Sequence, residues 1–135
     1  MTCLSYARER RYNPRMLRVL VIVCLVVNTG AGLALAVTRG GFLGQLGLPP
    51  PLPFYADLLA VFLVGSGLGF IPAVLNPQQQ RPYLWTFGVG VKLLAALLFV
   101  RLWLTGMVGW LPGVAAFADG TIAVLVLVAL LRPAR

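Results

Sequence analysis

The chain has 135 residues, of which 60% are hydrophobic and 10% are charged, with a net charge of +8 and no histidine. A soluble domain of this length keeps much of its surface in water and cannot bury so large an apolar fraction, so the composition predicts an integral membrane protein. The lack of histidine excludes haem ligation through His, His-based acid–base catalysis and zinc sites that contain His.

The first 16 residues form a basic head. Arginines are concentrated there and at the start of the apolar run that follows: Arg8, Arg10, Arg11, Arg15 and Arg18. Arginines beside an apolar run favour the cytoplasmic face and attract anionic lipid head groups, so we expect a lipid partner here and no nucleic acid. Cys3 and Cys24 match no metal-ligand spacing, and we expect two free thiols.

Four apolar stretches are long enough to span a membrane, which takes about 20 residues in a helix. They cover approximately residues 17–37, 54–75, 83–104 and 112–131. The first could instead be a cleaved signal peptide, but its apolar run is longer than a usual signal core. The sequence therefore predicts one domain, residues 1–135, folded as an all-α bundle of four transmembrane helices.

Basic residues are unequally divided between the two sides of the membrane. Besides the basic head, the inner side would hold Arg81, Arg132 and Arg135. The outer side would hold Arg39 and Arg101. Because positive residues accumulate in the cytoplasm, we expect both termini there. Aromatic residues, which prefer membrane interfaces, fit this orientation: Tyr83 and Trp85 inside, and Phe54, Tyr55, Trp103 and Trp110 outside.

The first outer loop, residues 39–53, differs from the other connections. It combines glycines with three consecutive prolines and several apolar side chains, whereas the turns at 76–82 and 106–113 are short. Consecutive prolines favour an extended backbone. We expect the loop to lie in the membrane interface and to include a short helical turn, either as a connector or as a lid.

The third span carries a lysine, Lys92, near its middle. Gly88, Ala95 and Ala96 share its helical face by the three- and four-residue rule, and small residues are typical of helix–helix contacts in membranes. A charge facing lipid at this depth would cost about 2.5–3.5 kcal/mol. Lys92 is therefore predicted to point into the bundle, where it needs an acidic partner.

Of the two acids within the spans, Asp119 is the favoured partner of Lys92. It lies about six residues into the fourth span, roughly 9 Å below the outer end. Asp57 is shallower, and we expect it to be wetted or to pair with Arg101, which should itself reach the outer interface. Asn28, on the first span, is placed to bond to the Lys92–Asp119 pair.

These residues allow two interpretations. The first is a small polar pocket that opens outward and is lined by Asn28, Asp57, Lys92 and Asp119, because ionisable residues inside a membrane are functional candidates. The second is a structural ion pair between Lys92 and Asp119 that fixes helix register. No nucleophile–base pair and no metal-ligand set is apparent in the sequence, so we expect neither an enzyme nor a cofactor.

Glycines are further candidates for contact residues, because they let membrane helices approach closely. We expect four of them at helix–helix contacts: Gly32, Gly65, Gly69 and Gly88. The four-residue spacing of Gly65 and Gly69 fits packing inside the bundle and, as an alternative, contact between two copies of the chain.

Four features of the sequence occur together. They are "LGLPPPLP" in the first outer loop, "GSGLGFIPAVLNPQQQRP" across the second span and inner turn, "GVGVK" ending at Lys92, and the acid Asp119. With them the chain resembles a family of small four-helix bacterial inner-membrane proteins, the DoxX-like group. Asn76 and Phe70 depart from the family pattern, which usually has Asp and often has Tyr there. The resemblance implies the fold and the bacterial inner membrane, but no reaction.

Two functions fit the sequence. The first is an accessory or scaffold subunit that packs against a larger membrane complex or assembles as a homo-oligomer, and the abundant glycine and few polar groups favour it. The second is binding or transport of a small lipophilic, quinone-like or cationic molecule near Lys92 and Asp119. Small multidrug exporters have a similar length but rely on a glutamate in the first helix, and this first helix has none.

Overall fold

The computed structural model describes residues 14–39, 41–45 and 53–131. Several expectations concern residues outside this part of the chain: Cys3, Arg8, Arg10, Arg11, Arg132, Arg135 and the proline-rich part of the first outer loop.

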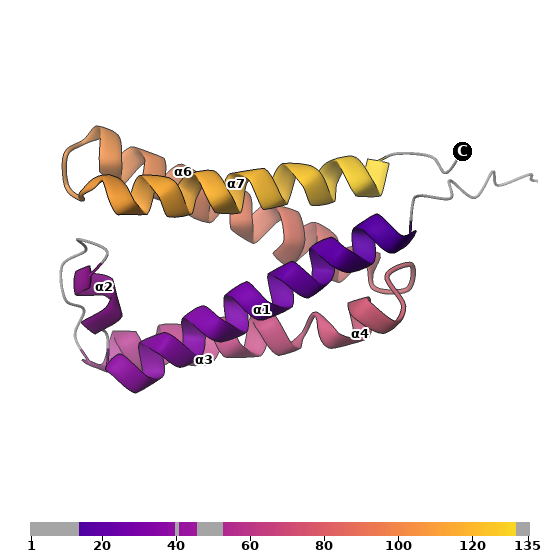
Figure 1. The fold of residues 1–135 in the computed structure, drawn as a ribbon, viewed down its shortest axis with the longest axis horizontal. Helices are drawn as coiled ribbons and strands as arrows, with labels where there is room; N and C mark the ends of the chain where they lie inside the picture. Colours follow the sequence, from indigo (N-terminus) through magenta and orange to yellow (C-terminus); the bar gives the residue numbers. More distant parts are fainter. Residues whose placement is uncertain (1–13, 40, 46–52, 132–135) are drawn as a thin grey trace, which may run out of the picture.

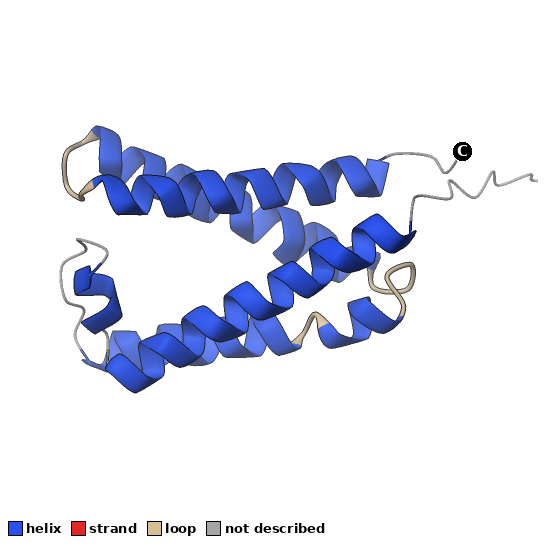
Figure 2. Cartoon of the chain, viewed as in Figure 1, coloured by secondary structure: helices blue, strands red, loops and turns tan. Residues whose placement is uncertain are grey.

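Every regular element in the described ranges is a helix (Figures 1 and 2). In chain order they are α1 (Pro14–Thr38), α2 (Gly41–Gln45), α3 (Pro53–Leu68), α4 (Ile71–Leu75), α5 (Arg81–Tyr83), the π-helix η1 (Leu84–Gly90), α6 (Val91–Leu104) and α7 (Trp110–Leu131). The short helix α2 is the helical turn expected in the first outer loop.

Four helical segments are long and apolar enough to cross a membrane: Arg15–Thr38, Phe54–Leu75, Arg81–Leu104 and Trp110–Leu131. They coincide with the predicted spans except at their ends. The first helix begins at Pro14 rather than at residue 17, because proline is well suited to the first helical position. The chain is a multi-pass integral membrane protein that folds as an all-α, four-helix bundle.

The bundle consists of two helical hairpins. α1 packs along α3, and α6 packs along α7. In Figure 1 the hairpins approach each other where α1 begins and α7 ends, which we call the terminal end. They diverge towards the opposite end, which we call the loop end, where α2 lies. The beginning of the first span and the end of the last span are therefore at the same end of the bundle.

The largest buried cluster lies towards the terminal end and draws on all four spans. Its members are Leu17, Val21, Cys24, Phe70, Ala73, Leu84, Val89, Val126, Ala129 and Leu130. Within it, Cys24 is a free thiol. Large apolar side chains on the outward faces, such as Val26, Leu97 and Phe117, are exposed. In a bilayer these faces contact acyl chains.

The second span is interrupted, although the sequence predicted one continuous helix over residues 54–75. Gly69 and Phe70 separate α3 from α4. The cause is Pro72 in the first turn of α4, which has no N–H to continue the hydrogen-bond ladder of α3. The Phe70 N–H donates to the Gly67 carbonyl at 3.0 Å instead of to Ser66, four residues earlier. Phe70 is fully buried in the core as a result.

The third span also departs from the expected regular helix. It starts as α5, continues as η1 and becomes α6 just before Lys92. In a π-helix the N–H bonds five residues back, and at the end of η1 the Val91 N–H donates to the Thr86 carbonyl. A π-helical segment widens the turn and changes the direction in which the following side chains point. This segment thus sets the direction of Lys92.

Candidate functional site

Lys92 forms an ion pair inside the bundle. Its Nζ lies 2.6 Å from Oδ1 of Asp119, the partner favoured by the sequence. The side chain of Lys92 is 4% exposed and that of Asp119 is 25% exposed. Gly88 and Ala96, on the same face as Lys92, are also buried. The face with small residues therefore points into the bundle.

Asn28 connects this ion pair to the other hairpin. Its Oδ1 accepts a hydrogen bond from Lys92 Nζ at 3.2 Å, and its Nδ2 donates to Ser66 Oγ at 3.4 Å. The Ser66 hydroxyl donates to the Leu63 carbonyl at 3.0 Å. Ser66, Asn28, Lys92 and Asp119 thus form a continuous polar chain with one residue from each span. We call these four residues the polar chain.

Ser66 was not among the site residues expected from the sequence. The signal available was weak: it is a hydroxyl residue between two glycines in an otherwise apolar span. Serine is common at membrane helix contacts and often only bonds to its own helix, as Ser66 also does through the Leu63 carbonyl. Only the position of Asn28 on the neighbouring helix shows that Ser66 belongs to the site.

Tyr83 supports the polar chain through the backbone of Ser66. The sequence placed Tyr83 at the membrane interface, but its hydroxyl donates to the Ser66 carbonyl inside the bundle. That carbonyl is available because the Phe70 N–H bonds to Gly67 instead, and a carbonyl inside a membrane protein requires a donor. The Tyr83 ring lies edge-on to Phe70 at a centroid distance of 5.0 Å and stacks on Phe87 at 4.6 Å.

The polar chain lies next to the buried cluster, with Asn28 one helical turn after Cys24 on α1. A lysine ammonium has three N–H donors, and Lys92 directs donors to Asn28 and Asp119. The two charges compensate each other. Removal of either partner from a buried ion pair typically costs about 3–5 kcal/mol, because the other charge is left unpaired. The geometry therefore disfavours rotation of any one helix against the others.

Asp57 does not join the polar chain, so the expectation of a single pocket lined by four polar residues is corrected. Asp57 is exposed on α3. Within the described part of the chain it forms no ion pair and no side-chain hydrogen bond. It lies one turn from the loop end and is too shallow to reach the Lys92–Asp119 pair. Instead it lines a groove of about 500 Å³ together with Ala36, Ala60, Val61, Val64 and Gly65.

Three of the four expected glycines lie at close contacts. A Cβ atom on Gly32 would lie 2.8 Å from the backbone nitrogen of Val64, which is too close for any side chain. A Cβ atom on Gly88 would lie 3.2 Å from a methyl group of α7. A Cβ atom on Gly69 would collide with the hydroxyl group of Tyr83. These glycines allow α1 to approach α3, and η1 to approach α7.

Gly65 is the exception, and the expectation that it packs inside the bundle is wrong. It is exposed, and a Cβ atom there would meet no atom within 4 Å. Gly67 makes the close contact instead, since a Cβ atom on it would lie 2.8 Å from the backbone nitrogen of Thr29. Two residues are separated by about 200° around a helix, so the rotation of α3 that directs Gly67 to α1 directs Gly65 away.

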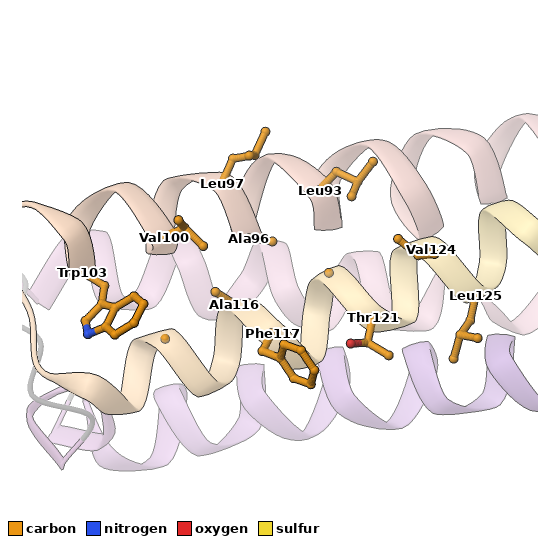
Figure 3. Close-up of a pocket in the computed structure, with 12 residues that line it drawn as sticks. Leu93, Ala96, Leu97, Val100, Trp103, Ala116, Phe117, Thr121, Val124 and Leu125 are labelled. Atoms are coloured by element: carbon orange, nitrogen blue, oxygen red, sulfur yellow. The ribbon is translucent and has the colours of Figure 1, made fainter.

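A second groove lies between α6 and α7 (Figure 3). It has a volume of about 570 Å³ and an almost entirely apolar lining. Small residues such as Ala96 and Ala116 are flanked by larger side chains such as Trp103 and Phe117 (Figure 3). Gly120, the neighbour of Asp119 in the sequence, also lines it. The groove thus adjoins the polar chain without including its charged groups.

Comparisons with known proteins give no relative, since no family model, no curated protein and no solved structure matches the chain. They give the expected DoxX-like relationship no support. Within the described ranges, no three His, Cys, Asp or Glu side chains lie close enough together to hold a metal ion. The fold and the polar chain define the class: a small multi-pass membrane protein with a polar contact across four apolar helices.

Proposed function

We propose that this chain is a non-catalytic scaffold or accessory subunit of the bacterial inner membrane, which packs against other membrane proteins or against copies of itself. The observation that carries the proposal is the polar chain. Lys92 directs its donors to Asn28 and Asp119 of its own chain and is almost completely buried. A lysine engaged in this way holds helices together and is not presented to a ligand.

Fixed helix register supports a scaffold role. In a bilayer, apolar side chains alone do not draw helices together, because lipid tails are as apolar as the helix surface. Polar contacts between helices therefore help to determine which helix faces pack against each other. Because each span contributes one member of the polar chain, rotation of any span would leave a polar group in apolar surroundings without a partner.

The outward faces of such a bundle are available to other helices. Two grooves are open on these faces, one between α6 and α7 and one beside Asp57. Both contain small residues at positions where a neighbouring helix or chain could approach closely. A rigid bundle with apolar grooves on its surface suits a protein whose role is to contact other membrane components.

A cytoplasmic position of both termini is part of the proposal. Arg15 and Arg81 lie at the terminal end, whereas Arg39 and Arg101 lie at the loop end. Positive residues accumulate on the cytoplasmic side and attract anionic lipids. The Arg81 guanidinium also donates to the Leu130 carbonyl at 3.1 Å and so joins α5 to the end of α7.

Binding of a small molecule is the second candidate function. The observation in its favour is that Asp119 is 25% exposed and adjoins the groove between α6 and α7 through Gly120. A lipophilic molecule with a cationic or hydrogen-bonding end, or a quinone, would place its apolar body in that groove. Its polar end would then compete with Lys92 for the Asp119 carboxylate.

Native mass spectrometry of the protein released from lipid nanodiscs distinguishes the two functions. The comparison is between the wild-type chain and the double variant Lys92→Met/Asp119→Leu, in which apolar side chains replace the whole ion pair. A scaffold is expected to appear in an assembly of more than one protein chain. The wild-type chain and the double variant should then form assemblies of the same composition. A wild-type monomer that carries a small molecule absent from the double variant would contradict the scaffold role and support binding.

A further inference from the structure

The groove beside Asp57 has the features of a contact site for another helix. Asp57, Val61 and Gly65 follow one another at four-residue intervals and therefore share one face of α3. All three are exposed. A glycine in a helix facing lipid has lower helix propensity than alanine by about 1 kcal/mol and gains no packing within the chain in return. At Gly65 the open space admits a large side chain of a neighbour.

α6 carries an exposed face with complementary properties. Leu94, Leu97 and Arg101 lie on it at three- and four-residue spacing. All three are exposed, and the Arg101 guanidinium forms no ion pair with any described residue. This face presents two large apolar side chains and one positive charge. The α3 face presents one negative charge and, at Gly65, an open space that we call the glycine notch.

The two charges lie at matching depths. Asp57 is four residues after the start of α3 at Pro53, and Arg101 is three residues before the end of α6 at Leu104. Both of these helix ends are at the loop end of the bundle (Figure 1). With a rise of about 1.5 Å per residue, the two charges lie about 6 Å and about 4.5 Å from these helix ends, measured along each helix.

The apolar positions farther from the loop end also lie at similar depths on the two helices, because α3 and α6 run in opposite directions. Val61 is level with Leu97 to within about 1.5 Å, and Gly65 is level with Leu94 to within about 3 Å, by the same rise per residue. An α6 helix placed beside α3 would thus set a leucine into the glycine notch and bring the two charges together. These three pairs of positions extend over about two helical turns.

Within one chain the two faces do not meet. Asp57 belongs to the hairpin of α1 and α3, and Arg101 belongs to the hairpin of α6 and α7. The hairpins diverge towards the loop end, where both residues lie (Figure 1). A second copy of the chain in the same membrane has both helices at the same depth and can supply the missing partner.

We infer that the chain associates with itself through these faces, with α6 of one copy in the α3 groove of the next. Leu94 packs against Gly65, and Arg101 forms an ion pair with Asp57 of the neighbouring copy. The two surfaces are different, so the contact is heterologous and each copy can use both surfaces. The inference rests on the homo-oligomer form of the proposed function and names its interface.

Charge exchange tests the interface in nanodiscs by native mass spectrometry. The variants are Asp57→Arg and Arg101→Asp, singly and together, with Arg39→Asp as a control that alters an arginine at the same end but outside both faces. The wild-type and control proteins are expected to be oligomeric. Each single variant is expected to be monomeric, because like charges meet at its interface, and the double variant is expected to recover the wild-type state.

A mixture of the two single variants gives the sharpest result. A chain with Asp57→Arg retains Arg101, and a chain with Arg101→Asp retains Asp57, so the native ion pair can form between them. The two substituted side chains carry opposite charges as well and can form the reversed pair at the other contact between the two chains. Assemblies that contain both variants in alternation are therefore expected from the mixture although each variant alone is monomeric. If both residues acted only by contact with lipid head groups or water, mixing would restore nothing, and that result would overturn the inference.

Gly65→Leu tests the same interface without a change of charge. Because Gly65 has open space around it, the thermal stability of the monomer should be unchanged while association is lost. Oligomers that persist in Gly65→Leu and in both charge variants would overturn the inference but leave the scaffold function in place. Wild-type monomers carrying a small molecule that depends on Lys92 and Asp119 would overturn the proposed function itself.

Discussion

At the scale of single residues, the contacts of Lys92 explain how a charge is accommodated in an apolar bundle. The ammonium group has an acidic partner, Asp119, and an amide partner, Asn28, from two other spans. The amide is oriented in turn by the hydroxyl group of Ser66. Each group in this series forms a hydrogen bond or ion pair with the next. A substitution at one position should therefore leave its neighbour without a partner and lower the free energy of unfolding.

A double-mutant cycle measures this dependence. Lys92→Met and Asp119→Leu should each lower the free energy of unfolding by about 3–5 kcal/mol, because each leaves a buried charge unpaired. The double variant should recover most of the loss, and the difference gives the coupling energy. The measurement is reversible unfolding in mixed detergent micelles.

The control pair is Arg101→Met and Asp57→Leu, measured where the chain is monomeric. These variants make the same chemical changes at charges that do not meet within one chain, so their effects should be small and additive. Additive losses at Lys92 and Asp119 as well would show that the ion pair contributes no coupling.

At the scale of elements, two interruptions decide which residues face one another. The break between α3 and α4 frees the Ser66 carbonyl for Tyr83, and the π-helix η1 sets the direction of Lys92. Glycines then determine how closely the helices approach. The sequence predicted breaks at neither place, since both stretches are apolar enough for a continuous span.

Matched glycine substitutions test the assigned rotation of α3 and α1. Gly32→Ala should lower the thermal stability in detergent, because its Cβ atom would meet the backbone of α3 and overpacking typically costs about 1–3 kcal/mol. Gly65→Ala is the control and should be neutral or slightly stabilising, since alanine is the better helix former and the site is open. The opposite ranking would mean that α3 is rotated with Gly65 towards α1.

At the scale of the whole molecule, the two hairpins share a buried cluster at the terminal end and diverge towards the loop end (Figure 1). The polar chain lies next to that cluster and includes residues of both hairpins. The divergence leaves the α3 and α6 faces open near the loop end. Association of two copies would cover them there.

Reporter fusions test the orientation of the whole molecule. A reporter that is active only in the cytoplasm should be active after Arg135 and inactive when it is inserted in the loop of residues 39–53. The physical reason is the accumulation of positive residues at the terminal end. Equal activity at both positions would contradict the three spans that lie between them, and the reverse pattern would contradict the orientation.

The sequence by itself determined the number of spans, because the length of an apolar stretch is set by the thickness of the bilayer. It also determined that Lys92 faces inward, because Gly88 and Ala96 lie four residues before and after it and so share its face of a regular helix. It favoured Asp119 over Asp57 from depth, which depends on the rise per residue along one helix. All three inferences use distances along one helix or periodicity within it.

The tertiary structure alone decided which faces of different helices meet. Periodicity fixes the faces of one helix relative to each other, but not the rotation of that helix against its neighbours. That rotation depends on the break at Gly69 and Phe70 and on the turn widened by η1, and the apolar pattern of the sequence indicated neither of them. For this reason the roles of Ser66 and Tyr83 were missed, and Gly67 rather than Gly65 packs against α1.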